Sequence, residues 1–497
     1  MARKVEDEGG IFERQGCGNV IYGKAIWENK KMNNIKHALY LKIIKAADAL
    51  MLTVPFLLCW FFYYADRLAS PFYFWGNWLV AALFLFVYAV FGKVYDAFLV
   101  SLNRISEMVY SQALAAVFSD FILYVVTCLL MKRLPNPLPL FGAFCGQLIL
   151  AAIWCIFAHK WYFAVFAPKK SAIIYDTRQG LEKLIGEYGL EKKFAVCFTA
   201  SVDECLNNMG ALLGIETVFL SGVHSHDRNI IMKYCVENNI GVYVIPRIGD
   251  VIMSGAKQMH MFHLPMLRVS RYSPSPFYLF VKRAFDIVVS GIALIVLSPV
   301  FFITAAAVKA TDGGPVFYKQ QRLTKDGKTF YIHKFRSMRV DAEKDGVARL
   351  STGDHDDRVT PVGKVIRRLR IDELPQLLDT ISGNLSIVGP RPERPEIAAL
   401  YEEAMPEFRL RLQAKAGLTG YAQVYGKYNT TPYDKLQMDL MYIAHPSILE
   451  DLRICLATVK ILLLPESTEG VSVGQTTAME REKDAKAPEN AEEAAVK

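Results

Sequence analysis

The nine cysteines of this chain form no CxxC pair and show no spacing typical of metal ligands. Several of them, such as Cys59, Cys128 and Cys155, lie in apolar runs, where a free cysteine usually acts as a small buried hydrophobic residue. The sequence also has none of the motifs of nucleic-acid-binding modules. These absences argue against a disulfide framework, a zinc domain and a nucleic-acid partner.

A signal peptide and a strong net charge are missing as well. Residues 1–42 are polar and charged without a signal-peptide pattern, so we expect a cytoplasmic N-terminal segment followed by a retained membrane anchor. The net charge is only +8, and its uneven distribution favours anionic lipid and phosphorylated substrates as partners. By contrast, hydrophobic residues make up 52% of the 497 residues, which is high for a wholly soluble protein. Part of the chain therefore belongs in a membrane.

Four long apolar segments follow one another, each close to the ~20 residues that cross a bilayer as a helix. They cover residues 43–64, 73–92, 110–131 and 139–166. Lysine and arginine are more frequent before the first segment, between the second and third, and after the fourth than in the other two loops. This excess predicts a four-helix transmembrane domain over residues 43–168 with both of its ends in the cytoplasm.

Residues 169–268 alternate short apolar runs with polar helical stretches, which is typical of a small Rossmann-like, doubly wound domain with a parallel sheet. The expected strands are residues 172–175, 194–199, 217–221 and 241–245. Such sheets often bind nucleotides, but the turn at residues 176–180 lacks the glycines of the GxGxxG motif. His224 and His226 have no further ligand spacing that would indicate a metal site. We expect a structural or regulatory domain here.

A proline-rich linker over residues 269–279 leads into a nearly uncharged run, residues 287–308, with Ser298-Pro299 at its middle. Proline in mid-helix removes a backbone hydrogen bond and bends the chain, and Ser298 can bond a freed carbonyl. A full span would put the basic segment that follows outside the cell, away from nucleotide-activated substrates. We therefore expect a re-entrant helix that enters one leaflet and returns, with an ordinary kinked span as the alternative.

The stretch Arg370-Ile371-Asp372-Glu373-Leu374-Pro375 holds two adjacent carboxylates among basic residues. Proline is tolerated in the first turn of a helix, so Pro375 predicts a helix that begins near Asp372. The N-terminus of a helix favours a carboxylate or a phosphate, and an ionised aspartate can attack phosphorus. In the alternative interpretation, Asp372 only caps the helix and Glu373 is a favourable first-turn charge.

Basic motifs flank this stretch on both sides. Residues 333–339 read His-Lys-Phe-Arg-Ser-Met-Arg, and Arg391 lies between two prolines. A rigidly presented guanidinium suits bidentate contact with a phosphate. We expect substrate phosphate binding by Lys334, Arg336, Arg367 and Arg391.

In this order, the segments closely resemble the bacterial sugar transferase domain of the monotopic phosphoglycosyl transferases. The resemblance runs from about Phe280 to Val473 and includes the KRAFD run, the Ser-Pro break, RIDELPQL and SIVGPRP. The four spans and the α/β domain further resemble the large form of this family, the undecaprenyl-phosphate sugar phosphotransferases that begin capsule, exopolysaccharide or O-antigen synthesis. The resemblance implies a cytoplasmic, mostly α catalytic domain over residues 280–474, including the re-entrant helix. Residues 475–497 lack aromatics and predict a disordered tail.

The resemblance also implies the reaction. A sugar-1-phosphate would pass from a UDP-sugar to undecaprenyl phosphate with release of UMP, through an aspartyl-phosphosugar intermediate on Asp372. Asp372 and Glu373 would hold the Mg²⁺ that the family needs. The lipid bilayer is a further partner, the bacterial inner membrane is the expected location, and a homodimer is the assembly that we consider. Sequence spacing does not identify the sugar.

Two other classes of protein stay open, a catalytically inactive membrane scaffold and a transport protein that binds lipid phosphates. An inactive relative would be expected to have lost Asp372, Arg336 or Arg391, and all three are present. A transporter should bury ionisable groups within its spans, where Asp120 is the one candidate that the sequence suggests. UMP release from UDP-sugars would separate the three classes.

Overall fold

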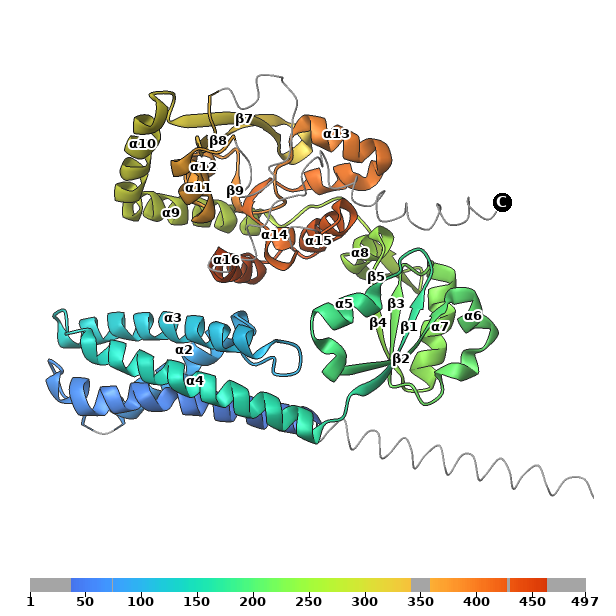
Figure 1. Ribbon diagram of the computed structural model, residues 1–497, viewed down its shortest axis with the longest axis horizontal. Coiled ribbons are helices and arrows are strands. Elements are labelled where there is room, and N and C mark those ends of the chain that lie inside the picture. The colour runs from blue at the N-terminus through green and yellow to red at the C-terminus, as the bar shows by residue number, and fades with distance from the viewer. Residues whose placement is uncertain (1–36, 74, 341–357, 427–429, 463–497) are drawn as a thin grey trace, which may run out of the picture. The chain divides into compact units, whose positions relative to one another are not determined.

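The computed structural model describes residues 37–73, 75–340, 358–426 and 430–462 (Figure 1). The chain divides into two compact units, Met1–Ile245 and Pro246–Lys497. The predicted tail over residues 475–497 lies outside the described residues.

The first unit begins with four helices that are long and apolar enough to cross a membrane. They are His37–Arg67, α2 (Gly76–Val94), α3 (Ile105–Met131) and α4 (Leu138–Val165), and the first ends in the turns η1 (Trp60–Tyr64) and η2 (Ala65–Arg67). The prediction of four apolar spans is confirmed.

Buried polar pairs join these helices. The amide of Gln112 donates to the carboxylate of Asp48 at 2.9 Å, and that of Gln147 donates to Asp120 at 3.4 Å. Asp48 is only 2% exposed, and the sequence analysis did not single it out. Because each amide donates to a carboxyl group on another helix, both pairs act as polar contacts between helices.

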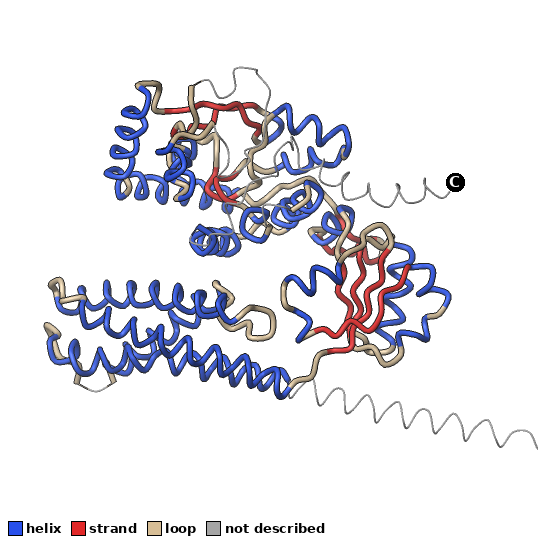
Figure 2. The backbone as a smooth tube through the Cα atoms, viewed as in Figure 1, coloured by secondary structure: helices blue, strands red, loops and turns tan. Residues whose placement is uncertain are grey.

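Four parallel strands form the second part of this unit, in the order β2-β1-β3-β4. The strands are β1 (Lys169–Tyr175), β2 (Phe194–Ser201), β3 (Thr217–Ser221) and β4 (Gly241–Val244). The connections hold α5 (Leu181–Glu187), η3 (Leu190–Lys192), α6 (Val202–Asn207), η4 (Met209–Leu212) and α7 (Ser225–Glu237). Helices flank the sheet on both sides (Figure 2). The predicted parallel sheet is confirmed.

The second unit starts with α8 (Ile248–Ser254), β5 (Lys257–Met261) and β6 (Leu264–Arg268), which the sequence assigned to the α/β domain. Ile248 and Val251 of α8 are buried in the same apolar core as Leu440. Burial of this apolar face is what attaches α8 to the second unit.

The remaining elements of the second unit are mostly helical. Before the 341–357 gap they are α9 (Pro276–Val296), α10 (Ser298–Asp312), β7 (Phe317–Leu323), η5 (Lys325–Gly327) and β8 (Thr329–Phe335). After it they are α11 (Pro361–Arg368), η7 (Ile371–Glu373), α12 (Gln376–Ser382), β9 (Ser386–Val388), α13 (Pro395–Ala404), η8 (Pro406–Gln413), β10 (Gly417–Thr419), α14 (Tyr421–Tyr425), α15 (Pro432–Ala444) and α16 (Ile448–Leu462). Strands β7 and β8 pair antiparallel, and β9 pairs with β10 in parallel.

Helices α9 and α10 form an apolar pair that bends by 64° at Leu297. Pro299 lies in the first turn of α10, where a missing N–H leaves no carbonyl unpaired. The Ser298 hydroxyl donates to the carbonyl of Ile295 at 2.8 Å. The predicted break at Ser298-Pro299 is confirmed.

Polar side chains in the N-terminal half of α9 bond to the core of the second unit. Arg283 donates to the carbonyls of Thr380 and Ile381 at 2.7 and 2.6 Å, at the C-terminal end of α12. Asp286 accepts a hydrogen bond from the backbone N–H of Ile387, a residue of β9, at 2.9 Å. These contacts fix α9 to the elements that carry the site.

A buried ion pair adds to this attachment. Lys282 lies 3.0 Å from the carboxylate of Asp451 on α16, and their side chains are 12% and 8% exposed. The hydroxyls of Tyr278 and Tyr442 each donate to the same carboxylate at 2.8 Å. The charge of Asp451 is therefore compensated by one cation and two hydroxyl groups.

Candidate active site

The two adjacent carboxylates lie in the short turn η7, between α11 and α12. Arg370 takes the left-handed conformation (φ 53°) and ends α11, so the chain turns before Asp372. The helix predicted to begin near Asp372 begins instead at Gln376, because Leu374 N–H bonds the Ile371 carbonyl in the tighter 3₁₀ pattern.

The capping interpretation of Asp372 finds no support in this geometry. Pro375 stands at the N-cap of α12, without a side-chain cap bond. Among the described residues, the Asp372 carboxylate accepts no hydrogen bond from a helix N–H. The group is partly buried and open to another partner.

Glu373 lies between two cations. Its Oε1 is 2.7 Å from Nζ of Lys334 on β8 and 3.3 Å from Nη2 of Arg391. Burial raises the pKa of Glu373, but the charges of Lys334 and Arg391 outweigh burial and hold the pKa well below its usual range. The two cations therefore favour the ionised form of Glu373.

Asp372 has the opposite electrostatic character. Burial, assisted by the neighbouring charge of Glu373, raises the pKa of Asp372 to about 6 against the attraction of Lys334, Arg367 and Arg391. A carboxylate of this kind is ionised at neutral pH yet destabilised by its surroundings. That state suits a nucleophile.

The rate of a reaction that uses Asp372 as a nucleophile should follow the ionisation of this group. The kcat/KM for the donor substrate is expected to rise as pH increases through about 6 and then to level off, because only the carboxylate attacks. A pH profile of initial rates measures this. A profile without an inflection between about pH 5 and 7 would contradict the role of Asp372.

The structure brings together five of the predicted basic and acidic residues around one point. Lys334 and Arg391 contact Glu373, and Arg367 on α11 acts on Asp372 through its charge. Together they surround the two carboxylates with three cations. Such an arrangement can hold the phosphates of a substrate beside Asp372.

Arg336 lies elsewhere in the site region. It forms an ion pair with Asp312 at the end of α10, and its backbone N–H donates to Val316 at 2.9 Å. In the described ranges, none of its hydrogen bonds or ion pairs goes to Asp372 or Glu373. Its Nη1 is buried without a hydrogen-bond partner.

Sequence analysis missed a pair that orients Lys334. The neighbouring residue, His333, donates its backbone N–H to Asp379 of α12 at 2.8 Å, and the His333 ring lies 2.6 Å from the same carboxylate. Asp379 is only 3% exposed. An aspartate among the residues that α12 buries, near Leu377, was the available signal. The pair ties β8 to α12 and so places Lys334 beside Glu373.

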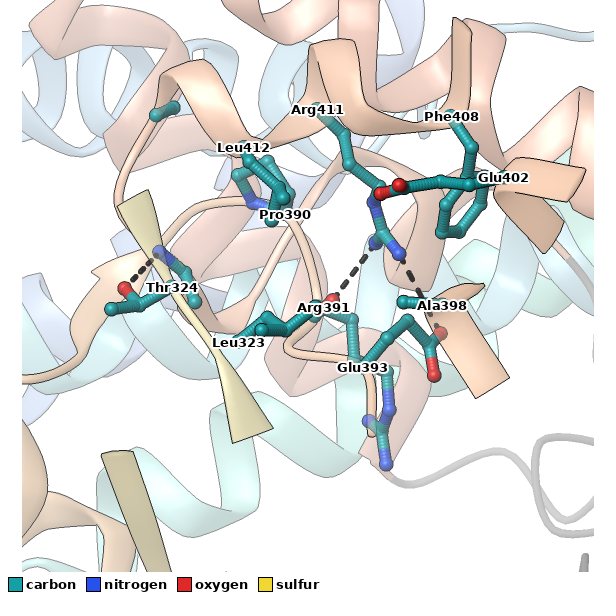
Figure 3. A pocket seen from close by; sticks show the side chains of 12 residues that line it. Leu323, Thr324, Pro390, Arg391, Glu393, Ala398, Glu402, Phe408, Arg411 and Leu412 are labelled. Carbon is teal, nitrogen blue, oxygen red and sulfur yellow. Dashed lines mark hydrogen bonds and ion pairs between the residues drawn. The ribbon is translucent and has the colours of Figure 1, made fainter. Parts of the chain in front are cut away.

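Behind Arg391, a small pocket is lined by apolar and charged side chains from several elements (Figure 3). Its wall includes Leu323 of β7, Phe408 and Arg411 of η8, and Glu402 of α13. The side chain of Arg391 extends away from Arg411, on the other side of the loop (Figure 3). The pocket therefore borders the loop that carries Arg391. Asp372 and Glu373 do not line it.

Comparison with known proteins covers the part of the chain that holds this site. Residues 277–465 match the family described as Bacterial sugar transferase. The chain is 36% identical over 232 residues to UDP-N-acetylgalactosamine-undecaprenyl-phosphate N-acetylgalactosaminephosphotransferase of Aeromonas hydrophila, which covers 46% of this chain and 54% of that protein.

Two further relatives each match part of the chain. The chain is 41% identical over 190 residues to exopolysaccharide production protein PSS of Rhizobium leguminosarum bv. phaseoli, with 36% of this chain and 94% of that protein covered. It is 37% identical over 212 residues to UDP-glucose:undecaprenyl-phosphate glucose-1-phosphate transferase of Escherichia coli (strain K12). This match covers 42% of this chain and 44% of that protein. The chain thus spans about half the length of two of these relatives and nearly all of the third.

Proposed function

The chain belongs to the bacterial sugar transferase family, and from this we propose that it transfers a sugar-1-phosphate from a UDP-sugar to undecaprenyl phosphate. The products are undecaprenyl-diphosphate-sugar and UMP. The observation that carries the proposal is the contrast between the neighbouring carboxylates. Glu373 forms ion pairs with two cations, whereas burial raises the pKa of Asp372. The reaction is the first membrane step of capsule, exopolysaccharide or O-antigen synthesis.

We propose a reaction in two displacements. A carboxylate oxygen of Asp372 attacks the sugar-bearing phosphorus, and the bond from that phosphorus to the UMP oxygen breaks, so UMP leaves with the bonding electrons. A phosphate oxygen of undecaprenyl phosphate then attacks the same phosphorus and displaces Asp372 as a free carboxylate. One phosphate-sized site can therefore serve a water-borne donor and a lipid-borne acceptor in turn.

The basic residues of the site have defined roles in this proposal. Lys334, Arg367 and Arg391 offset the negative charge of the diphosphate, which would otherwise repel the attacking carboxylate. Arg336 is paired with Asp312, so its proposed contact with a substrate phosphate would require this ion pair to open. Glu373 holds Lys334 and Arg391 in place when no substrate is bound.

Mg²⁺ is part of the same proposal, and the donor set fits it. Mg²⁺ is usually bound by one or two carboxylates together with water and substrate phosphates. Lys334 and Arg391 both use Oε1 of Glu373, which leaves its other oxygen and the Asp372 carboxylate as donors. When bound, the ion would neutralise charge that develops on the phosphates.

We propose that α9 and α10 form a re-entrant pair in the bacterial inner membrane, with the catalytic unit in the cytoplasm. The 64° bend at Leu297 supports this topology, as do the polar contacts of Arg283 and Asp286 with the core. The sheet of the first unit is proposed to be a Rossmann-like structural or regulatory domain. We also expect a homodimer, which mass measurement in detergent would test.

A cysteine in place of Lys328 tests the topology. Lys328 is exposed between η5 and β8, so its substitute should react with a membrane-impermeant thiol reagent only after the cells are opened. A cysteine in place of Leu134, which is 84% exposed between α3 and α4, should react in intact cells. Modification is read at each position by mass spectrometry. Reaction at position 328 in intact cells would establish an ordinary fifth span.

The activity is tested by measuring UMP release from a panel of UDP-sugars, with and without undecaprenyl phosphate. Lipid-linked sugar and UMP should form together with at least one UDP-sugar. Lipid phosphate binding without UMP would favour a transport protein, and neither binding nor UMP would favour an inactive scaffold. Activity only with a CDP-activated alcohol would overturn the proposed donor class.

A further inference from the structure

We propose that Arg411 and Arg322 are positioning residues that clamp the backbone of residues 390–393, here called the Arg391 loop. The inference rests on the proposed function, since it assigns these two arginines the task of presenting Arg391 to the donor phosphate. Neither of them contacts Asp372 or Glu373 among the described residues.

All four carbonyl groups of the Arg391 loop accept a hydrogen bond from another element. The bonds are Gly417 N–H to Pro390 (2.9 Å), Arg411 Nη2 to Arg391 (2.8 Å), Arg322 Nη1 to Pro392 (3.0 Å) and Leu323 N–H to Glu393 (2.9 Å). Two come from backbone groups of strands, and two come from arginine side chains. Prolines at two of the four positions supply no N–H, so the carbonyl groups are the main points of attachment.

Arg411 is held firmly enough to act as a clamp. Its side chain is 5% exposed and its guanidinium lies 2.7 Å from Asp439, which is 1% exposed. Glu393 is 3.6 Å away, and the Phe408 ring centre is 4.9 Å from the guanidinium carbon. A buried arginine is costly unless its donors are satisfied, and here one donor is directed to the Arg391 carbonyl.

Arg322 holds the next carbonyl, that of Pro392. Its Nε and Nη2 donate to the amide oxygen of Gln320 at 3.1 and 2.6 Å, which leaves Nη1 for Pro392. The planar fork of the guanidinium makes these bonds in one fixed geometry. A lysine could keep the charge but could not make them together.

The Arg391 side chain needs this support because it is itself loosely enclosed. It is 44% exposed and its one side-chain contact to the catalytic turn, with Glu373, measures 3.3 Å. The backbone therefore sets the point from which the guanidinium reaches Glu373. A displacement of ~1 Å at a catalytic group can lower a rate by roughly 10²-fold.

The test is a double-mutant cycle on the full-length protein. Arg411→Lys is expected to lower kcat/KM for the UDP-sugar by about 10-fold, chiefly through KM, because Arg391 is displaced from the donor phosphate. In the Arg391→Ala background, the same change should lower kcat/KM by less than about 2-fold, since there is no guanidinium left to position. Arg409→Lys, an exposed change on the same helix η8, is the matched control and should leave the rate unchanged.

An equal loss in both backgrounds would overturn the inference, because it would show that Arg411 supports only the fold. Arg322→Lys is the second variant and carries the same expectation if Arg411→Lys does not yield folded protein. Absence of UMP release by the unaltered protein would instead refute the proposed function. The two failures are therefore distinguishable.

Discussion

Asp372→Asn is expected to lower the rate of UMP release by roughly 10³-fold or more, because the amide cannot attack phosphorus. The change keeps the shape of the side chain in the turn η7. With the unaltered protein, UDP-sugar labelled in the sugar should leave label attached to Asp372 and release UMP when no lipid acceptor is present. If UMP appears only with undecaprenyl phosphate and no label is trapped, direct displacement through a ternary complex is the better mechanism.

Asp372→Asn is not expected to reduce the stability of the folded protein. The folded-state pKa of Asp372 is raised to about 6, so the folded protein holds the proton more tightly than the unfolded chain does. The stability associated with this group is present below its unfolded pKa, near 4, and is lost as pH rises through about 6. At pH 8 the substitution removes an unfavourable charge, so Tm should be equal to or above that of the unaltered protein. A lower Tm would point to a structural role for Asp372.

Asp451→Ala is expected to destabilise the second unit by about 3–5 kcal/mol, because it leaves Lys282 buried without a counter-charge. The hydroxyls of Tyr278 and Tyr442 lose their acceptor as well. Thermal unfolding in detergent measures the effect. The matched control is Asp326→Ala, which breaks the exposed ion pair with Arg271 and should cost less than about 1 kcal/mol.

The double change Lys282→Met with Asp451→Leu separates charge from packing. It removes both partners of the ion pair and should be milder than Asp451→Ala alone, because no uncompensated charge stays buried. A double variant that is as unstable as the single one would show that packing, and not charge, dominates at this position.

The elements that sequence predicted correctly are those whose signal is local. The four spans follow from uninterrupted apolar runs, and the strands of the parallel sheet follow from short apolar runs between polar helices. The break before Pro299 follows from a single residue type with a fixed backbone angle. In each case the cause and its effect lie within one secondary-structure element or at its end.

The features that sequence did not predict depend on partners far apart in the chain. Asp379 holds β8 from a distance of 46 positions, and Arg411 reaches back 20 positions to the Arg391 carbonyl. The ion pair between Arg336 and Asp312 likewise depends on the packing of α10 against β8. Side-chain periodicity shows that such residues are polar and buried, but it does not show which partner each one meets.

The hydrogen bonds from Arg283 to the last carbonyls of α12 bear on the depth at which Asp372 lies relative to the membrane surface. Helix α12 follows directly on the turn that holds Asp372, so Arg283 links α9 to the element next to the carboxylates. A helix that spans a bilayer must match its thickness by tilting, whereas a pair that returns within one leaflet has no far surface to match. On the proposed re-entrant topology, membranes of different thickness would present the acceptor phosphate to Asp372 at the same depth.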